Sequence, residues 1–415
     1  MCVVLALLLR VRFYQCEAML TASLLGVYCE RSRQFHKYAI NVKRVVILSS
    51  RLFYDLTSIM LKIRPATIND VAARAGVSYQ TVSRVINQHP SVSKDALERV
   101  KKAIEALNYQ PSNAARHLAT QSSKVIGVIS YGTIHYGPAQ MLASLEKAAQ
   151  GSGYALSNVN VSDLTFEEIS AAIQTLRRQR VDGLILFAPL IGIAHTDLES
   201  ICADLPLVIT DAEPQPGRAV ASIDQFTGGR LSAQHLIGLG HRQIALLSGP
   251  LSWYDALLRH QGWLSALQQA GLTPTATLES DWTPASGYRA TVTLLEAGTP
   301  VTGLLVANDQ MALGALRALH ERGLQLPRDV SVVGFDDIPE AAFLEPPLTT
   351  VRQDFSSLAQ RSLDQLKACI DQPNAPRHLT MLVPELIVRS STAAPAMKLE
   401  PHIHTLTRAT LRRKT

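Results

Sequence analysis

The chain has 415 residues, of which 47% are hydrophobic and 18% are charged. A chain of this length and composition can bury more than one hydrophobic core, so two or three globular units are expected. The net charge is +6, but residues 60–123 carry nine Lys and Arg against four Asp and Glu, whereas residues 124–415 carry 23 against 27. This uneven distribution excludes a uniformly basic protein and is typical of a DNA-binding head on a near-neutral body.

The cysteine and motif patterns exclude several other classes. Three of the five cysteines lie in the first 30 residues, and Cys202 and Cys369 are isolated, so neither a disulfide framework nor a structural metal is expected. The chain has no GxSxG motif, no phosphate loop and no His cluster with metal-ligand spacing. We therefore expect a cytoplasmic protein that is not an enzyme and has no cofactor.

Residues 1–59 are interpreted as an N-terminal extension, either a mis-assigned start or a disordered segment. The apolar run Val3–Leu9 is too short to span a bilayer, and no basic residue precedes it as in an export signal. Met60 opens the short run Met60–Pro65 directly before the first convincing helix, which indicates that translation begins at or near Met60. A membrane anchor is the alternative, although no membrane partner is expected, and N-terminal sequencing of the native protein distinguishes the two.

Residues 66–122 predict a small all-α unit followed by a hinge. Thr67 with Asp70 three positions on is a helix-start pattern, and Gly76 ends that helix. A second helix is predicted from Tyr79 to about Asn87, and a third begins near Ser93 and completes the core. Two short helices joined by a tight turn form a helix-turn-helix.

The second helix of such a motif lies in the major groove, so its polar residues are candidate DNA contacts. Tyr79, Gln80 and Arg84 are predicted to contact base edges, because Gln pairs with adenine and Arg with guanine. The other predicted DNA-binding residues of this unit are Thr67, Ser78, Thr81, Ser83 and Asn87, of which the last three are assigned to phosphates. A merely solvated polar face is the alternative.

These motifs resemble the headpiece of the lactose/galactose repressor family. The matching runs are Ile68–Ala72, Gly76–Ser78 and Thr81–Asn87, and Ser78–Val85 resembles the lactose-repressor branch, which implies a similar operator half-site. In the family, the segment that matches residues 113–119 is a hinge helix that folds on DNA. Asn113 and Leu118 are therefore predicted to bind DNA, with Leu118 as an apolar wedge in the minor groove. A plain linker is the alternative.

From Lys124 onward, short β-branched runs alternate with helical stretches. The predicted buried strands lie at residues 125–129, 181–187, 206–209, 243–247, 303–306 and 330–334. This alternation indicates parallel α/β sheets, in which ligands bind beyond the carboxyl ends of the strands. The predicted fold class is thus multi-domain, with an all-α headpiece and hinge followed by a parallel α/β body.

The residues at those strand ends suggest a sugar site. The predicted effector-binding residues are Asp211, Arg259, Trp282, Asn308, Asp336 and Gln353. Carboxylates and amides bond vicinal hydroxyls, Arg supplies fixed donors, and an indole covers the apolar face of a sugar ring. Taken singly, a strand-end Asp is more often a turn former or a helix cap.

Residues 124–392 also resemble the body of the same family, which implies a periplasmic-binding-protein-like sensor of two subdomains joined by three crossings. The implied N-subdomain spans about 124–223 and 355–382, the C-subdomain about 224–351 and 383–392, and residues 393–415 form a tail. The six effector residues match the family's effector contacts by position. The chain departs from the family pattern at Phe187, where the lactose-repressor branch has Asn, and at Trp253, Tyr254 and Asp255, which replace small residues. The six matching residues favour a galactoside effector. Because the rim of the pocket differs, a related β-glycoside or another saccharide stays open.

The expected partners follow from these assignments. One headpiece contacts only a half-site, so a homodimer on pseudo-palindromic double-stranded operator DNA is predicted. Leu399, Ile403 and Leu406 are spaced like a leucine coil, but Pro401 interrupts them, and a tetramer is not expected. The rival class, a periplasmic sugar-binding protein, would need an export signal and no headpiece. Effector as inducer and effector as corepressor both stay open, because each needs only different affinities for two states.

Overall fold

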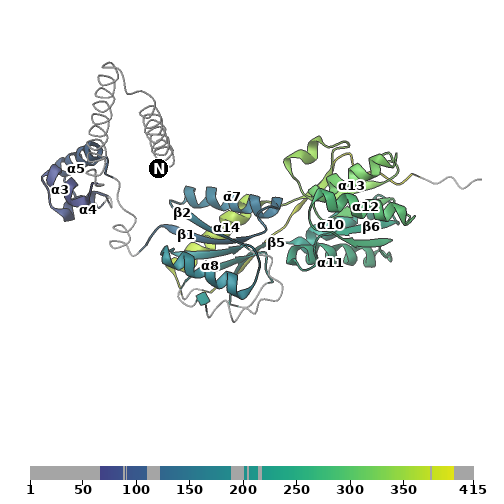
Figure 1. The fold of residues 1–415 in the computed structure, drawn as a ribbon, viewed down its shortest axis with the longest axis horizontal. Helices are drawn as coiled ribbons and strands as arrows, with labels where there is room; N and C mark the ends of the chain where they lie inside the picture. The colour runs from purple at the N-terminus through teal and green to yellow at the C-terminus, as the bar shows by residue number, and fades with distance from the viewer. Residues whose placement is uncertain are drawn as a thin grey trace, which may run out of the picture. The chain divides into compact units, whose positions relative to one another are not determined.

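The chain forms two compact units, residues 1–112 and residues 113–415 (Figure 1). The computed structural model describes residues 66–86, 89, 91–109, 122–187, 201–202, 205–213, 217–373 and 376–396. Asn87, Asn113 and Leu118 lie outside the described residues, as do residues 1–59 and most of the predicted tail.

The first unit contains the three predicted short helices, α3 (Ile68–Ala75), α4 (Tyr79–Ile86) and α5 (Lys94–Leu107). Their apolar faces form one core around residues such as Val71, Val82 and Val100. Helix α3 begins in a capping box, in which the Thr67 and Asp70 side chains bond each other's backbone amides, and ends at Gly76 with φ of 63°. The predicted helix-turn-helix is confirmed.

The first lobe of the second unit is a parallel six-stranded sheet between helices. Its elements are β1 (Val125–Tyr131), α7 (Tyr136–Gly151), β2 (Ala155–Val161), α8 (Phe166–Arg178), β3 (Gly183–Phe187), β4 (Leu207–Thr210), β5 (Ala219–Ile223), α14 (Phe355–Asp371) and β11 (Leu379–Leu382), with strand order β11-β5-β4-β3-β1-β2. Helices α7 and α14 pack together on one face and share a core with it, while a separate core lies under α8 (Figure 1).

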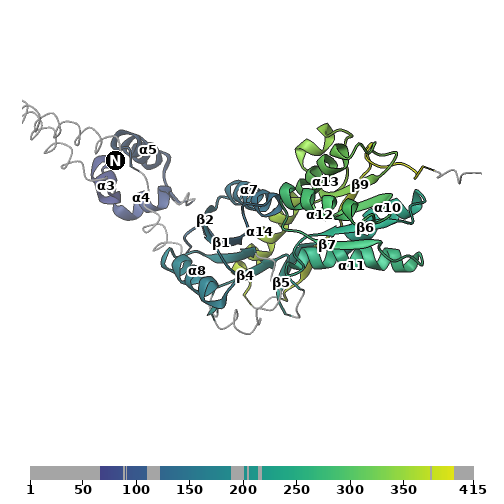
Figure 2. The same ribbon diagram turned by 45° about the vertical axis from the view of Figure 1, so that its right-hand side comes forward.

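The second lobe repeats this design. Its elements are α10 (Gln225–Gly238), β6 (Ile244–Ser248), α11 (Tyr254–Gln269), β7 (Ala276–Glu279), α12 (Pro284–Glu296), β8 (Gly303–Val306), α13 (Asp309–Glu321), β9 (Ser331–Asp336), the 3₁₀-helix η1 (Pro339–Phe343), β10 (Thr349–Arg352) and β12 (Glu385–Ile387). The strand order is β12-β10-β9-β8-β6-β7, and only the β10–β12 pair among those described in this sheet is antiparallel. Helix α10 packs on α11 and α12 on α13 (Figure 2).

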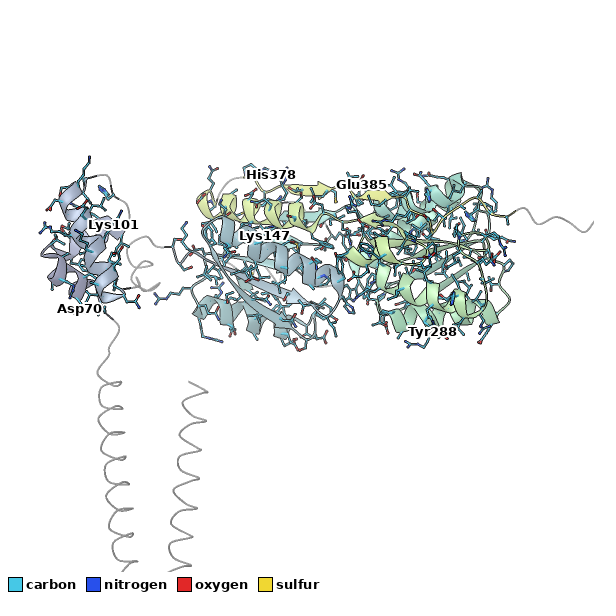
Figure 3. All side chains as sticks on the ribbon, turned by 90° about the horizontal axis from the view of Figure 1, so that it is seen from above. Asp70, Lys101, Lys147, Tyr288, His378 and Glu385 are labelled. Atoms are coloured by element: carbon cyan, nitrogen blue, oxygen red, sulfur yellow. The ribbon has the colours of Figure 1, made fainter. Side chains whose placement is uncertain are left out.

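The chain passes between the lobes three times, from β5 to α10, from β10 to α14 and from β11 to β12. The third crossing can be followed in Figure 3 between His378, which precedes β11, and Glu385, which begins β12. Asp224 and Asp354 lie in the first two crossings and cap α10 and α14, accepting hydrogen bonds from Thr227 N and Ser357 N. Both helices therefore begin at the crossings, and the crossings themselves are only a few residues long.

None of the helices in the described part of the chain has the length and apolar character needed to cross a membrane. Within the same residues, His, Cys, Asp and Glu form no group of three or more that could hold a metal ion.

Candidate functional site

Helix α4 presents a polar face to solvent. Tyr79 is 50% exposed and Gln80 and Arg84 are exposed, whereas Val82 and Val85 are buried in the core of the unit. The three residues predicted to contact bases therefore lie on the open side of the second helix. Because a helix in the major groove uses this side, the geometry suits the predicted role.

Three of the other predicted headpiece residues, Thr67, Ser78 and Thr81, form hydrogen bonds within the headpiece. Ser78 Oγ accepts a hydrogen bond from Thr81 N at 3.2 Å, and the two hydroxyl oxygens lie 2.9 Å apart at the start of α4. Thr67 holds the capping box of α3, and Ser83 is half-buried. In this structure Thr67, Ser78 and Thr81 shape the helix starts, and the phosphate contacts assigned to Thr81 and Ser83 stay predictions.

A cavity of about 400 Å³ lies between the two lobes of the second unit, at the carboxyl ends of the strands. All six predicted effector-binding residues line it, although they come from widely separated parts of the chain. The other lining residues are His135, Tyr136, Gly137, Pro138, Phe187, Trp253, Asp255 and Phe355. The structure thus brings the six predicted residues together, and their binding role stays a prediction.

Three of the cavity residues have strained backbone conformations. Asp211 follows β4 with φ of 54°, Trp282 follows β7 with φ of 73°, and Asp336 ends β9 with φ of 116°. Non-glycine residues in this region cost free energy, and such positions cluster at ligand sites. The turn at each strand end is held in a form that directs the side chain toward the cavity.

Three hydrogen bonds and one ion pair join four buried side chains in a ring, and three of the four residues line the cavity. Arg259 Nε donates to Gln225 Oε1 at 2.8 Å, Gln225 Nε2 donates to Gln353 Oε1 at 2.8 Å, and Gln353 Nε2 donates to Asp336 Oδ1 at 2.6 Å. Arg259 Nη1 closes the ring at 3.9 Å from Asp336 Oδ1. All four side chains are buried. Gln225 was missed by the sequence analysis, because the strand that precedes it was not predicted.

Arg259 is fixed on several sides. Its Nη1 donates to the Ala307 carbonyl oxygen at 2.6 Å, and its guanidinium carbon lies 3.9 Å from the Phe335 ring centroid. A Cβ atom on Gly229 would collide with the Arg259 carbonyl oxygen, so glycine is required where α10 passes α11. This close approach sets the depth at which the guanidinium enters the cavity.

The polar residues at the strand ends divide into two groups. Asp309 accepts bonds from Thr350 Oγ1 and Ile338 N, and Asp337 accepts bonds from Arg352 and Arg389, so both have structural partners. Asn308 caps α13 through Met311 N, and its amide donates to the Trp282 carbonyl oxygen at 3.1 Å. Asn308 therefore also fixes the backbone of Trp282, the residue that carries one of the two indoles of the cavity.

The carboxyl groups of the cavity are buried and have altered acidity. Desolvation raises the pKa of Asp336 to about 6, although the Arg259 guanidinium opposes the shift. Desolvation, together with the negative charge of Asp255, raises the pKa of Asp211 well above its ordinary value. Burial also lowers the pKa of His135. Near neutral pH the cavity therefore holds carboxyl groups that can take up protons.

Trp253 reaches across the cleft. Its ring centroid lies 5.4 Å from that of Tyr131 and 5.7 Å from that of His135 in the first lobe, and 5.7 Å from that of Trp282 in its own lobe. Tilted and edge-to-face pairs at these distances are attractive. The rim departure noted in the sequence is thus an aromatic bridge between the lobes.

Comparisons with known proteins were made for both units. Residues 67–112 match the family described as bacterial regulatory proteins, lacI family, and residues 233–392 match a periplasmic binding protein-like domain. The chain is 41% identical over 332 residues to the lactose operon repressor of Escherichia coli K12, covering 80% of this chain and 92% of the relative. It is 37% identical over 333 residues to the transcriptional repressor PurR of Haemophilus influenzae, covering 79% and 98%.

Solved structures give the same result. A lac repressor dimer bound to operator and the anti-inducer ONPF is 40% identical, with a TM-score of 0.74, covering 80% of this chain and all of that one. A complex of the transcriptional regulator CelR with cellobiose is 31% identical, with a TM-score of 0.58, covering 79% and 100%. The fold and the non-enzymatic class predicted from the sequence are confirmed. The chain therefore belongs to the lacI family of bacterial regulatory proteins and is a DNA-binding transcriptional repressor.

Proposed function

We propose that this repressor controls carbohydrate-utilisation genes and is released from a pseudo-palindromic operator by a small sugar, with galactosides as the favoured class. The observation that carries this proposal is the composition of the cavity, in which two indoles lie beside carboxyl groups, two amides and a guanidinium. A sugar ring presents an apolar face and several hydroxyls, and this set of groups complements both.

The position of the cavity supports a small-molecule effector, because such sites lie preferentially between lobes and at the strand ends of α/β sheets. Asp211, Phe187 and Phe355 come from the first lobe, and Arg259 and Trp282 come from the second. An effector in the cavity would touch both lobes and would favour the lobe arrangement that it fits best.

The second candidate class is a β-glucoside disaccharide. The CelR relative is described in complex with cellobiose, and this chain has aromatic side chains at the rim, Trp253 and Phe187, where the lactose-repressor branch has small or polar residues. Extra aromatic surface suits a second sugar ring, since indoles and phenyl rings cover the apolar faces of pyranosides.

The proposed DNA-binding step depends on the two-fold symmetry of the operator. We assign the headpiece and hinge to residues 66–122 and the sensor to residues 124–392, and two copies are needed to contact both halves of a palindrome. Effector binding changes the angle between the lobes, the two hinge segments separate, and the paired headpieces lose their joint fit to the operator.

The test is binding of the purified full chain to a labelled lac-type palindromic operator at one fixed salt concentration, because affinity for DNA depends strongly on salt. Galactosides, cellobiose and free nucleobases are added in turn. Release by a galactoside supports the proposal, and release by cellobiose alone supports the second class. Release by nucleobases alone, or specific binding that none of these compounds changes, would reject a sugar effector.

An operator with one half-site scrambled is the matched control for the DNA part. We expect at least about a hundredfold weaker binding to it, since one headpiece then loses its specific contacts. Equal binding to both duplexes would contradict recognition by a symmetric dimer.

A further inference from the structure

Three buried polar atoms in the cavity have no hydrogen-bond partner. They are Asp211 Oδ1, Asp255 Oδ1 and Trp282 Nε1, and all three residues line the cavity. Asp211 is 6% exposed and Trp282 is 5% exposed. Buried polar atoms are nearly always paired, so three orphans around one cavity indicate groups arranged to bind a ligand.

Of these three residues, Asp255 is the one that the sequence analysis did not assign to effector binding. It lies in the first turn of α11, where an acidic residue is common because it faces the positive end of the helix. A residue with that function alone stays solvated, but Oδ1 of Asp255 is buried without a partner, and Arg259 Nη2 is 4.0 Å from Oδ2. Its charge also acts on Asp211, which belongs to the opposite lobe.

The charges around the cavity do not balance. The lining residues include three carboxyl groups, Asp211, Asp255 and Asp336, and Arg259 is the one side chain with a fixed positive charge among the described lining residues. Even if Asp211 and Asp255 share one proton, the two remaining negative charges outnumber the single guanidinium. Because the groups are buried, this excess is poorly screened by salt.

We propose that Asp211 and Asp255 form an acceptor pair that binds donor groups of the effector and excludes anionic sugars, so that the effector is an uncharged or amino-bearing saccharide. This inference rests on the proposed sugar-responsive function and restricts its ligand class. Two carboxyl groups that line one cavity, each with an unpartnered oxygen, suit a ligand with two adjacent donors, such as a vicinal diol or an ammonium group. An incoming carboxylate or phosphate meets like charge without a second cation to compensate it.

The test is calorimetric titration of the full chain at pH 8 with D-galactose, D-galactosamine and D-galacturonate, which share one ring configuration. We expect galacturonate to bind at least about tenfold more weakly than galactose, and galactosamine to bind at least as tightly as galactose. In Asp255→Asn the galacturonate-to-galactose ratio of dissociation constants should fall by about tenfold. Glu146→Gln, the same chemical change at an exposed residue of α7, should leave the ratio unchanged.

Galacturonate binding as tightly as galactose to the wild type, or an unchanged ratio in Asp255→Asn, would overturn the inference. Asp255→Ser provides a second variant if the asparagine variant has a lowered melting temperature. If no galacto sugar binds, the proposed galactoside effector fails, and the same charge series in gluco configuration tests the pair independently. An acidic sugar as the best ligand of either series, or binding by no neutral or amino sugar in either, would also overturn it.

Discussion

The two walls of the cavity come from lobes with the same fold but carry different chemistry. The first-lobe wall is formed by His135, Tyr136, Gly137, Pro138, Phe187, Asp211 and Phe355, and the second-lobe wall by Trp253, Asp255, Arg259, Trp282, Asn308 and Asp336. The first is mainly apolar and aromatic, whereas the second holds the guanidinium and most of the carboxyl and amide groups. One topology can therefore supply two walls of different chemistry. We infer that the second-lobe wall, here called the anchoring wall, binds most of the polar groups of the effector, and that the first-lobe wall, the covering wall, encloses it.

The largest effect is expected from Arg259→Met. Removing the guanidinium breaks the ring with Gln225 and leaves buried carboxyl groups uncompensated, which should cost about 3–5 kcal/mol of unfolding free energy and abolish effector binding. Urea unfolding and calorimetry measure both. Arg317→Met removes an exposed Arg of α13 paired with Glu321, and should cost less than about 1 kcal/mol. Equal losses of unfolding free energy in the two variants would show that Arg259 does not anchor the second-lobe wall.

The next largest effect is expected in the pH dependence of the unfolding free energy, through Asp336 of the second-lobe wall. The folded-state pKa of Asp336, about 6, lies above the ordinary 3.8, so its contribution to stability is complete below the ordinary value and is lost as pH rises through about 6. Relative to Asp336→Asn, the wild type should lose up to about 3 kcal/mol of unfolding free energy between pH 4 and pH 7. Unfolding of both proteins across this range measures it. A difference that stays constant, or that grows with pH in favour of the wild type, contradicts the burial argument.

A smaller effect should separate the walls directly. Trp282→Leu removes one indole of the anchoring wall and should weaken effector binding by about 1–2 kcal/mol, which is roughly five- to thirtyfold. Phe187→Leu keeps an apolar side chain on the covering wall and should change affinity by less than about threefold. Titration of both variants with the effector found in the operator assay gives the comparison. A larger loss from Phe187→Leu would reverse the roles of the walls.

The smallest effect concerns the aromatic bridge. Trp253→Leu removes ring pairs with Tyr131 and His135 that are worth about 0.5–1.5 kcal/mol each, and it widens the rim. Affinity for galactosides with a bulky aglycone should rise relative to those with a methyl aglycone, by less than about tenfold. Tyr288→Leu, at a residue of α12 outside the cavity lining, is the control. An unchanged ratio would mean that the bridge does not limit ligand size.

The sequence predicted six buried strands, whereas it missed the edge strands and the two short interior strands β5 and β10. All six predicted strands are present, because continuous β-branched runs such as those of β1 and β9 need burial on both faces. The edge strand β2 was missed because Ser157, Asn158 and Asn160 interrupt its apolar pattern, and β5 was missed because it is short and rich in Ala. β-strand propensity is a weak guide where one face or one edge of a sheet is open to solvent.

The same reasoning limits what could be predicted of the site. Asp211, Asn308 and Asp336 were found because they stand directly after predicted strands, and Gln225 was not, because it follows β5. Asp255 was noticed only as a departure from the family pattern. The lack of partners on its Oδ1 depends on which groups the fold places around it, and spacing along the chain carries no such information.

The hydrogen-bonded ring has a consequence for how such a repressor can be altered. Gln225 and Gln353 stand at two of the three crossings, so the hydrogen bond between them connects the cavity lining to the segments that join the lobes. A substitution in the ring would therefore change ligand preference and the resting level of gene expression at the same time. Variation that retunes ligand choice alone has to occur at lining positions outside the ring and outside the aromatic bridge, such as Phe187. This chain differs from the lactose-repressor branch at Phe187, and such a difference is an evolutionary route that changes the signal and keeps the switch.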